Sequence, residues 1–311
     1  MSNRVKTLSG AEINPFCFGT MQWGGKADHA ASQSLYQNCR KAGINHFDTA
    51  HAYCEGASEK LLGAFCEKER DELLIATKVG YVGGASRPNL LAQFDQCQKR
   101  LKMDVIDVLY LHRFDPETPI EETLETIIEL IQSGKIRYFG ISNFSAWQGM
   151  DTIHRARSFD LVIDFFQPMY NLVKRQAEVE ILPMCAANGI NVATYSPLGG
   201  GLLTGKYLRG EQGRLVEDDR YALRYEPAFM SATAKMLCDF ANALKVNPAT
   251  LAVAWVRAHP SQPMPIISAS SADQLVPAID AMTYPLSDEL YNQITALSPT
   301  PPPATDRIDE A

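Results

Sequence analysis

Short apolar runs and longer amphipathic segments alternate along this chain from one end to the other. The short runs are rich in β-branched and aromatic residues, which is typical of buried strands. They predict core strands at Phe16–Thr20, Ile44–Asp48, Leu73–Val79, Val108–His112, Ile136–Ser142, Val162–Gln167, Ile190–Tyr195 and Ile266–Ser268. Because the segments between them repeat apolar residues at helical spacing, the pattern predicts strands alternating with helices.

The segments between the strands carry the start and stop signals of helices. Pro119 suits a first helical turn, and Gly43, Gly134 and Gly189 each follow a helical segment where a left-handed residue commonly ends it. A further helix is expected at Ser287–Leu297. The other clear helical segments are Asp28–Ala42, Ser58–Lys68, Asn89–Leu101, Pro119–Ser133 and Gln176–Asn188.

About eight strand–helix units follow one another without a break in composition, which predicts a single (β/α)8 barrel over residues 1–311. An N-terminal β-hairpin is expected at Arg4–Ile13, and the Pro-rich tail 298–311 is expected to be mobile. The insertion Gly199–Pro227 is too long for an ordinary loop, and in a barrel it would cover the active face. The alternative is a doubly wound open sheet, but its GxGxxG fingerprint is absent after the first strand.

Composition narrows the classes of partner. The net charge of −7 and the pI near 5.4 argue against nucleic acid or an anionic membrane as a partner. No signal core and no apolar run of roughly 18–20 residues are present, so no membrane span is predicted. The seven cysteines form no CxxC pair, which indicates free thiols, no metal site and a cytoplasmic location. The sequence does not indicate an oligomeric state.

Four polar residues fall at or just after consecutive predicted strands: Asp48, Tyr53, Lys78 and His112. Taken singly, each has an ordinary explanation, as a loop cap, a packing ring, a surface lysine and a core histidine. In a barrel, however, the carboxyl ends of the strands share one face, and active sites are built there. We therefore expect these four side chains to meet.

The four residue types together suit proton donation by a phenol. A free tyrosine has a pKa near 10, too high for efficient donation at neutral pH, and a nearby ammonium lowers it. Lys78 is expected to act in this way on Tyr53, with Asp48 holding the lysine and His112 orienting a carbonyl oxygen. No side chain supplies a hydride, so reduction of a carbonyl requires a cofactor.

The chain resembles the aldo-keto reductases. The motifs FDTAHAYCEGASEKLLG, ATKVG, LYLHRFDPETPIEETLETI, SGKIRYFGISNFS, FFQPMYN and YSPLGGGLLTGKY occur in the family order and cover nearly the whole length. The last motif resembles the branch of aryl-alcohol dehydrogenase-like reductases and potassium-channel β subunits. The resemblance implies a (β/α)8 barrel, a nicotinamide cofactor and reversible reduction of an aldehyde or ketone. It assigns Tyr53 as general acid, Lys78 and Asp48 as its tuning pair, and His112 as the group that positions the carbonyl.

The same resemblance assigns the nicotinamide end of the cofactor. Ser142, Asn143 and Gln167 match the residues that hold the carboxamide, and uncharged donors and acceptors suit an amide. Tyr195 matches the aromatic ring that stacks on the nicotinamide. The other positions that match this end are Gly19, Thr20 and Asp48.

The phosphate end follows from the last motif. Lys206 matches a phosphate-facing lysine of the channel-β-like branch. Without the resemblance it would be interpreted as a solvated loop lysine, and Asn143 as a turn residue. The stretch that backs the pyrophosphate is matched by Ser196, Pro197, Leu198 and Gly199.

After the eighth strand, the segment PIISASSADQLVPAID departs from the family pattern. Ser270 and Gln274 fit that pattern. Ser268 stands where the family has a turn glycine, and Pro277 and Ala278 replace a Glu-Asn pair that contacts adenine.

The departure bears on the choice of cofactor. No Lys or Arg lies between Arg257 and Arg307, although a 2′-phosphate is normally met by a cation. Serine hydroxyls can accept it instead, or Arg214 or Arg220 of the insertion can reach over. NADP(H) is the predicted cofactor, and NAD(H), or use of both, is the alternative.

The substrate pocket is the least determined part of the site. Arg113 follows His112 and faces either a substrate carboxylate or the side of the barrel. The walls are expected to include Trp23, Tyr53, His112, Tyr81 and Phe114. The insertion residues that can enter the site are Arg220, Arg224 and Tyr225.

Two other functions stay open at this point. Lys78 suits a Schiff-base aldolase, although the nearby Asp48 disfavours one. A cofactor-bound regulatory subunit with little turnover is the second alternative. If the protein is an enzyme, its predicted partner is a small-molecule substrate, a carbonyl or alcohol compound.

Overall fold

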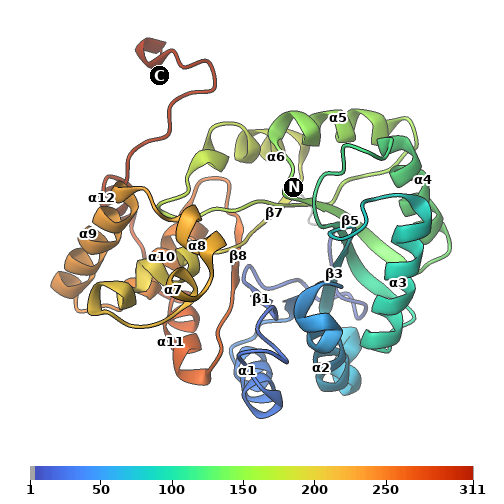
Figure 1. Cartoon of the computed structure of the whole chain (residues 1–311), viewed down its shortest axis with the longest axis horizontal. Coiled ribbons are helices and arrows are strands. Elements are labelled where there is room, and N and C mark those ends of the chain that lie inside the picture. The colour runs from blue at the N-terminus through green and yellow to red at the C-terminus, as the bar shows by residue number, and fades with distance from the viewer. Residues whose placement is uncertain (1–3, 311) are drawn as a thin grey trace.

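The computed structural model describes residues 4–310, and its parallel strands close into one barrel (Figure 1). Each strand pairs in parallel with its neighbour in the sequence, and β8 pairs with β1 to complete the ring. The predicted (β/α)8 barrel is confirmed. The strands are β1 Cys17–Gly19, β2 His46–Asp48, β3 Leu74–Val79, β4 Ile106–Leu111, β5 Ile136–Ser142, β6 Phe165–Gln167, β7 Asn191–Thr194 and β8 Met264–Ile267.

The helices surround the barrel, as Figure 1 shows. Side-chain caps fix several starts, for example Asp28, which accepts a hydrogen bond of 2.8 Å from the Ala31 amide. The helices are α1 His29–Lys41, α2 Ala57–Cys66, α3 Arg87–Leu101, α4 Ile120–Gln132, α5 Ala146–Arg157, α6 Ile181–Asn188, α9 Ala228–Leu244, α10 Pro248–Ala258, α11 Ala272–Asp280 and α12 Asp288–Thr295.

Two helix starts differ from the prediction. Pro119 precedes α4 as its N-cap, with an extended ψ of 128°, and does not lie in the first turn. The segment predicted as one helix over Gln176–Asn188 begins with a 3-10 turn at Gln176–Glu178, and α6 starts only at Ile181. The predicted ends hold better, because Gly43, Gly134 and Gly189 all have positive φ angles.

The N-terminal segment covers the amino-terminal end of the barrel. The predicted hairpin is reduced to a single antiparallel bridge between Lys6 and Glu12. Val5 is fully buried among the side chains of the barrel interior, and Arg4 forms an ion pair with Asp164. This end of the barrel is therefore closed by packing.

The interior of the barrel changes character along its axis. Toward the amino-terminal end it is filled by apolar side chains that include Leu74, Val108 and Phe165. Toward the carboxyl ends of the strands the buried side chains are polar, with Asp48 and Lys78 among them. Buried polar groups need partners, so this end is the place where a site is expected.

The insertion Gly199–Pro227 has secondary structure of its own. It contains 3-10 turns at Gly199–Thr204 and Lys206–Arg209, followed by the short helices α7 Arg214–Glu217 and α8 Asp219–Arg224. Lys26, in the loop after β1, forms an ion pair with Glu217 of α7. The insertion is thus tied to a loop at the carboxyl-terminal face of the barrel.

The C-terminal segment ends the description of the fold. The predicted last helix is present as α12, and the chain beyond it runs away from the barrel (Figure 1). The mobility of this tail stays a prediction. Among residues 4–310, none of the helices combines the length and the apolar character that a bilayer crossing requires.

Candidate active site

Lys78 lies at the centre of the polar end of the barrel. Its side chain is fully buried and forms an ion pair with Asp48 of β2. Its Nζ also donates to the Thr49 carbonyl at 2.8 Å and lies 3.4 Å from the Tyr53 hydroxyl. The second carboxylate oxygen of Asp48 accepts a bond of 2.9 Å from Gln167 of β6. Four of the predicted residues therefore form one hydrogen-bonded group.

Strand register explains why these residues meet. In β2 and β3, Asp48 pairs with Ala76, and Lys78 lies two positions further along the same inward-facing row. The chain then leaves β2 through a loop held by a 3.0 Å bond from the His51 amide to the Lys78 carbonyl. Tyr53 begins the 3-10 turn that follows, so its ring returns over the lysine.

His112 borders the same group from the end of β4. Its ring meets the Tyr53 ring edge-on, with centroids 5.8 Å apart, and the Tyr81 ring lies 4.9 Å away. Burial, reinforced by Lys78 and Arg113, lowers the pKa of His112 to about 3. The imidazole is consequently neutral at neutral pH and can donate a hydrogen bond without carrying a charge.

The pKa of Tyr53 moves in the direction opposite to the sequence-based expectation. Burial raises the pKa of its phenol above the usual value, and Lys78 opposes the rise without cancelling it. Burial alone would lower the pKa of Lys78, but Asp48 and Tyr53 outweigh it, so the lysine pKa is raised. The phenol is therefore protonated and the amine charged at neutral pH.

The residues predicted at the nicotinamide end also gather beside His112. The Asn143 amide donates to the His112 carbonyl at 2.8 Å, and its oxygen accepts from the Tyr195 hydroxyl at 2.6 Å. Ser142 donates to the Gln167 carbonyl at 3.0 Å. Asn143 has a left-handed φ of 59°, so it is a turn residue as well as part of this cluster. The ends of β4 to β7 are thereby joined around one space.

The remaining predicted cofactor positions lie at the ends of β1, β7 and β8. Thr20 is buried and donates to the Asp48 carbonyl, and Ser196 begins a turn that closes on Gly199 at 2.9 Å. Pro197 and Leu198 are the central residues of this turn. Gly19 has no room for a side chain, since a Cβ there would lie 2.8 Å from Ile266.

Among the residues predicted at the phosphate end of the cofactor, one hydroxyl lacks a hydrogen-bond partner in the described part of the chain, and other side chains contact their neighbours. The hydroxyl of Ser268, at the end of β8, is buried and has no hydrogen-bond partner among the described residues. Ser270 donates to the Gln274 side chain at 2.8 Å, so these two residues pair with each other. Lys206 lies within the insertion, its Nζ 4.9 Å from the Tyr207 ring. Ala278 of α11 is buried.

Trp23, a predicted wall of the pocket, packs among other aromatic rings. Its ring is fully buried and packs against Phe18, Phe47 and Phe65, with centroid distances of 5.6, 6.5 and 5.6 Å. That Trp23 also lines the pocket stays a prediction. Tyr81, by contrast, is 43% exposed.

Sequence reasoning missed a second layer of support for the Tyr53 loop. Glu59 of α2 is fully buried and accepts from Thr77 at 2.7 Å and from Arg100 at 3.1 Å. Arg100 of α3 also donates to the His51 carbonyl at 2.9 Å. The available signal was Glu59 itself, a charged residue on the same helical face as buried Leu62 and Cys66.

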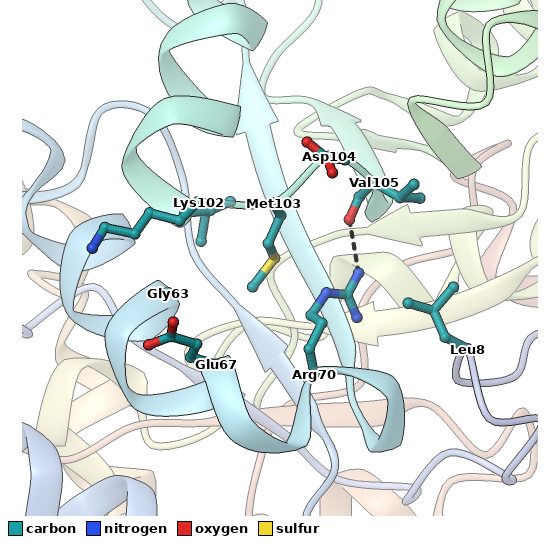
Figure 2. A pocket seen from close by; sticks show the side chains of 9 residues that line it. Leu8, Gly63, Glu67, Arg70, Lys102, Met103, Asp104 and Val105 are labelled. Atoms are coloured by element: carbon teal, nitrogen blue, oxygen red, sulfur yellow. Dashed lines mark hydrogen bonds between the residues drawn. The ribbon is translucent and has the colours of Figure 1, made fainter.

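A surface pocket of about 300 Å³ lies away from this site (Figure 2). Its lining includes Leu8 and the residues just before β4, which places it at the amino-terminal ends of the strands. Arg70 crosses it to the Val105 carbonyl at 2.9 Å, as Figure 2 shows, and pairs with buried Asp107 at 2.7 Å. In barrels this end serves stability, so the pocket is structural.

The model of the aldo/keto reductase family matches residues 15–299 of this chain. The chain belongs to the aldo/keto reductase family. A probable voltage-gated potassium channel subunit beta from Oryza sativa subsp. japonica is 32% identical, with 96% of this chain and 97% of that protein covered. L-glyceraldehyde 3-phosphate reductase from Escherichia coli K12 is 30% identical, with 91% and 89% covered. Aflatoxin B1 aldehyde reductase member 2 from Rattus norvegicus is 36% identical, with 65% and 57% covered.

Family membership confirms the resemblance inferred from the motifs. The protein is an oxidoreductase of this family, whose members generally use NADP(H). The match spans the barrel and all the strands that carry the site residues.

Proposed function

We propose that this protein reduces an aldehyde or a ketone to the alcohol, reversibly, with Tyr53 as the proton donor. The observation that carries the proposal is the position of Lys78 Nζ, which pairs with Asp48 and lies 3.4 Å from the Tyr53 hydroxyl. Neutral His112 meets the Tyr53 ring edge-on and supplies the hydrogen bond that orients the carbonyl oxygen. The arrangement suits protonation of an oxygen on which negative charge develops.

The charges of the group support donation by Tyr53 at neutral pH. Because burial raises the pKa of the phenol, the proton is present when the substrate arrives. Once the proton has left, the phenolate lies beside the Lys78 ammonium, which stabilises it. Asp48 and the Thr49 carbonyl hold that ammonium in place, so little rearrangement accompanies the transfer.

A nicotinamide cofactor fits the residues at the strand ends, and when bound it supplies the hydride. Ser142, Asn143 and Gln167 offer the donors and acceptors that a carboxamide needs. The unpartnered hydroxyl of Ser268 and the ammonium of Lys206 suit phosphate oxygens. On this basis NADP(H) is the proposed cofactor, with NAD(H) or dual use as the alternative.

Replacement of Tyr53 by Phe tests the proton donor. The Tyr53→Phe variant is expected to keep cofactor affinity and lose about 100- to 10,000-fold in kcat, the usual contribution of a general acid. Turnover is followed by NADPH absorbance and binding by quenching of protein fluorescence. Tyr138→Phe, at the opposite end of the barrel beside Lys6, is the matched control and should retain activity. Near-full activity in Tyr53→Phe would disprove the mechanism.

A screen of aldehydes and ketones with NADPH and NADH side by side tests the cofactor. Comparable kcat/KM with both cofactors would replace the NADP(H) proposal by dual use.

A regulatory subunit with little turnover is the second candidate, because the rice relative named as a probable channel subunit beta matches nearly the whole chain. Two results together would favour a regulatory subunit over a metabolic reductase: the cofactor stays bound through purification, and turnover is slower than about one per minute.

A Schiff-base aldolase finds less support, since the raised pKa keeps Lys78 protonated. Borohydride trapping of a substrate on Lys78 would reverse that conclusion.

A further inference from the structure

Two cations and two tyrosines pack together beside the site. Arg224, the last residue of α8, lies over the Tyr221 ring with its Cζ 5.0 Å from the centroid. Lys174, in the loop after β6, lies 5.7 Å from the centroid of the Tyr225 ring. The two cations are close enough for Arg224 to contribute, after burial, to a lowered pKa of Lys174. We call Lys174 and Arg224 the mouth cations.

The mouth cations have no acidic partner among residues 4–310. No Asp or Glu side chain in this part of the chain forms an ion pair with Lys174 or Arg224. Two other arginines of the insertion are paired, Arg209 with Glu211 at 2.7 Å and Arg220 with Asp218 at 2.8 Å, whereas Arg214 lies over the Tyr221 ring. Two like charges held together without a counter-ion repel each other, and an anion binding between them removes that cost.

Hydrogen bonds tie residues next to the mouth cations to the reacting end of the site. Asn171 donates to the Tyr225 hydroxyl at 3.4 Å and to the Ser196 carbonyl at 2.9 Å, so α8 is tied to the residue that follows Tyr195. Tyr195 in turn bonds to Asn143, which bonds to the His112 carbonyl.

Electrostatic coupling agrees with this placement. Tyr221 lies near enough to Tyr53 to contribute to its raised pKa, after burial and the charges of Lys78 and Asp48. Arg224 opposes the effect of burial on the pKa of Tyr195. Arg224 therefore lies within electrostatic range of Tyr195, one of the residues grouped around the space beside His112.

We infer that Arg224 and Lys174 form a subsite for an anionic group on the substrate, a carboxylate or a phosphate. The inference rests on the proposed reductase function and adds a substrate class, carbonyl compounds that carry a negative charge away from the reacting carbon. A guanidinium presents paired donors that match such oxygens, and a neighbouring ammonium adds charge. Cofactor phosphates share this chemistry, so the test must separate the two sources.

The test compares benzaldehyde with 4-carboxybenzaldehyde, which differ only in the charged group. In the Arg224→Met variant, the ratio of kcat/KM for the charged to the neutral aldehyde is expected to fall about 10- to 100-fold, mainly through KM, as loss of one charged hydrogen bond implies. Lys174→Met should lower the ratio in the same direction. Arg209→Met, which removes a paired arginine of the same insertion, should leave the ratio unchanged.

Three outcomes are informative in different ways. An unchanged ratio in Arg224→Met and Lys174→Met overturns the inference while the reductase function stands. A weakened NADPH affinity, with both aldehydes affected equally, also overturns it and assigns the cations to a cofactor phosphate. If the wild-type protein reduces neither aldehyde nor any other carbonyl compound with NADPH or NADH, the proposed function itself fails.

Discussion

Lys78 shows how a single residue decides the chemistry at the carboxyl end of the barrel. A buried ammonium is costly unless a carboxylate and further acceptors surround it. Asp48 and the Thr49 carbonyl provide these acceptors, and the remaining direction points at the Tyr53 hydroxyl. The same lysine keeps His112 neutral by adding to the effect of burial. One cation thus acts on two neighbouring rings, adding to the effect of burial on the pKa of His112 and opposing it on the pKa of Tyr53.

His46 is a second buried histidine, in the barrel interior near Phe165, and neither ring nitrogen has a partner among the described residues. Burial, with a contribution from Lys78, lowers its pKa to about 3, below the ordinary 6.5. The unfolded chain therefore takes up a proton as the pH falls through 6.5 while the folded protein does not. The folded protein is therefore destabilised by His46 as the pH falls from 6.5 toward 3, and this loss is absent above pH 6.5.

The His46→Leu variant tests this linkage. It should remove about 1.4 kcal/mol per pH unit from the slope of unfolding free energy against pH between pH 5 and 6. At pH 7 it should be neutral or slightly stabilising, since two unpartnered polar atoms disappear. Urea unfolding at several pH values measures both effects. An unchanged slope would show that His46 titrates normally in the folded protein.

At the residue scale, the sequence predicted which residues meet at the site better than it predicted how deeply each one is buried. Asp48, Tyr53, Lys78 and His112 were predictable because strand ends in a barrel share one face. The net pKa shift of Tyr53 was not, because burial depends on the packing of neighbouring loops. The packing of Trp23 was not predictable for the same reason, since its ring meets Phe65 of the helical layer.

At the scale of elements, α3 supports the Tyr53 loop from outside the barrel. Arg100 connects the His51 carbonyl with buried Glu59 of α2, which in turn accepts from Thr77 beside Lys78. Gly56 allows this approach, since a Cβ there would lie 2.4 Å from the guanidinium. The position of Tyr53 thus depends on two helices as well as on β2.

The Arg100→Gln variant tests this dependence. Loss of the bond to His51 should let the Tyr53 loop shift and lower kcat about 10- to 100-fold, with little change in KM. Arg87→Gln is the control on the same helix, because its ion pair with Glu129 is exposed and worth little. Restoration of most of kcat in Arg100→Lys would confirm a positioning role. Equal losses of kcat in Arg87→Gln and Arg100→Gln would contradict it.

Elements were predictable where hydrophobic periodicity decides them. β5 matches its predicted bounds, Ile136–Ser142, at both ends. The N-terminal hairpin is shorter than predicted, with one antiparallel bridge, because its residues pack under the barrel through Val5. The start of α6 depends on the 3-10 turn before it, which local sequence does not reveal.

At the scale of the whole molecule, the two ends of the chain differ in what they contribute. Residues 4–12 close one end of the barrel, where Arg4 pairs with Asp164 and the Tyr138 hydroxyl donates to the Arg4 carbonyl. The family match ends at residue 299, and the side chains at positions 304–309 are exposed.

Deletion of each end should therefore have different effects. Removal of residues 1–12 exposes the interior around Val5 and leaves buried Asp164 without its cation, so a loss of about 3–5 kcal/mol is expected. Removal of residues 300–311 should change the free energy of unfolding by less than about 0.5 kcal/mol. Urea unfolding of the two deletions measures both. Equal stability in both deletions would show that the N-terminal segment does not seal the barrel.

The mouth of the barrel is built from segments that are separate in the sequence. Tyr81 follows β3, Arg113 follows β4, and Arg224 belongs to the insertion after β7. None of these side chains belongs to the apolar interior of the barrel, so each can be replaced without repacking that core. For protein engineering, libraries restricted to these three segments should change which carbonyl compounds are accepted while thermal stability is retained. For the same reason, substitutions in these loops can change the substrate during evolution with little loss of stability.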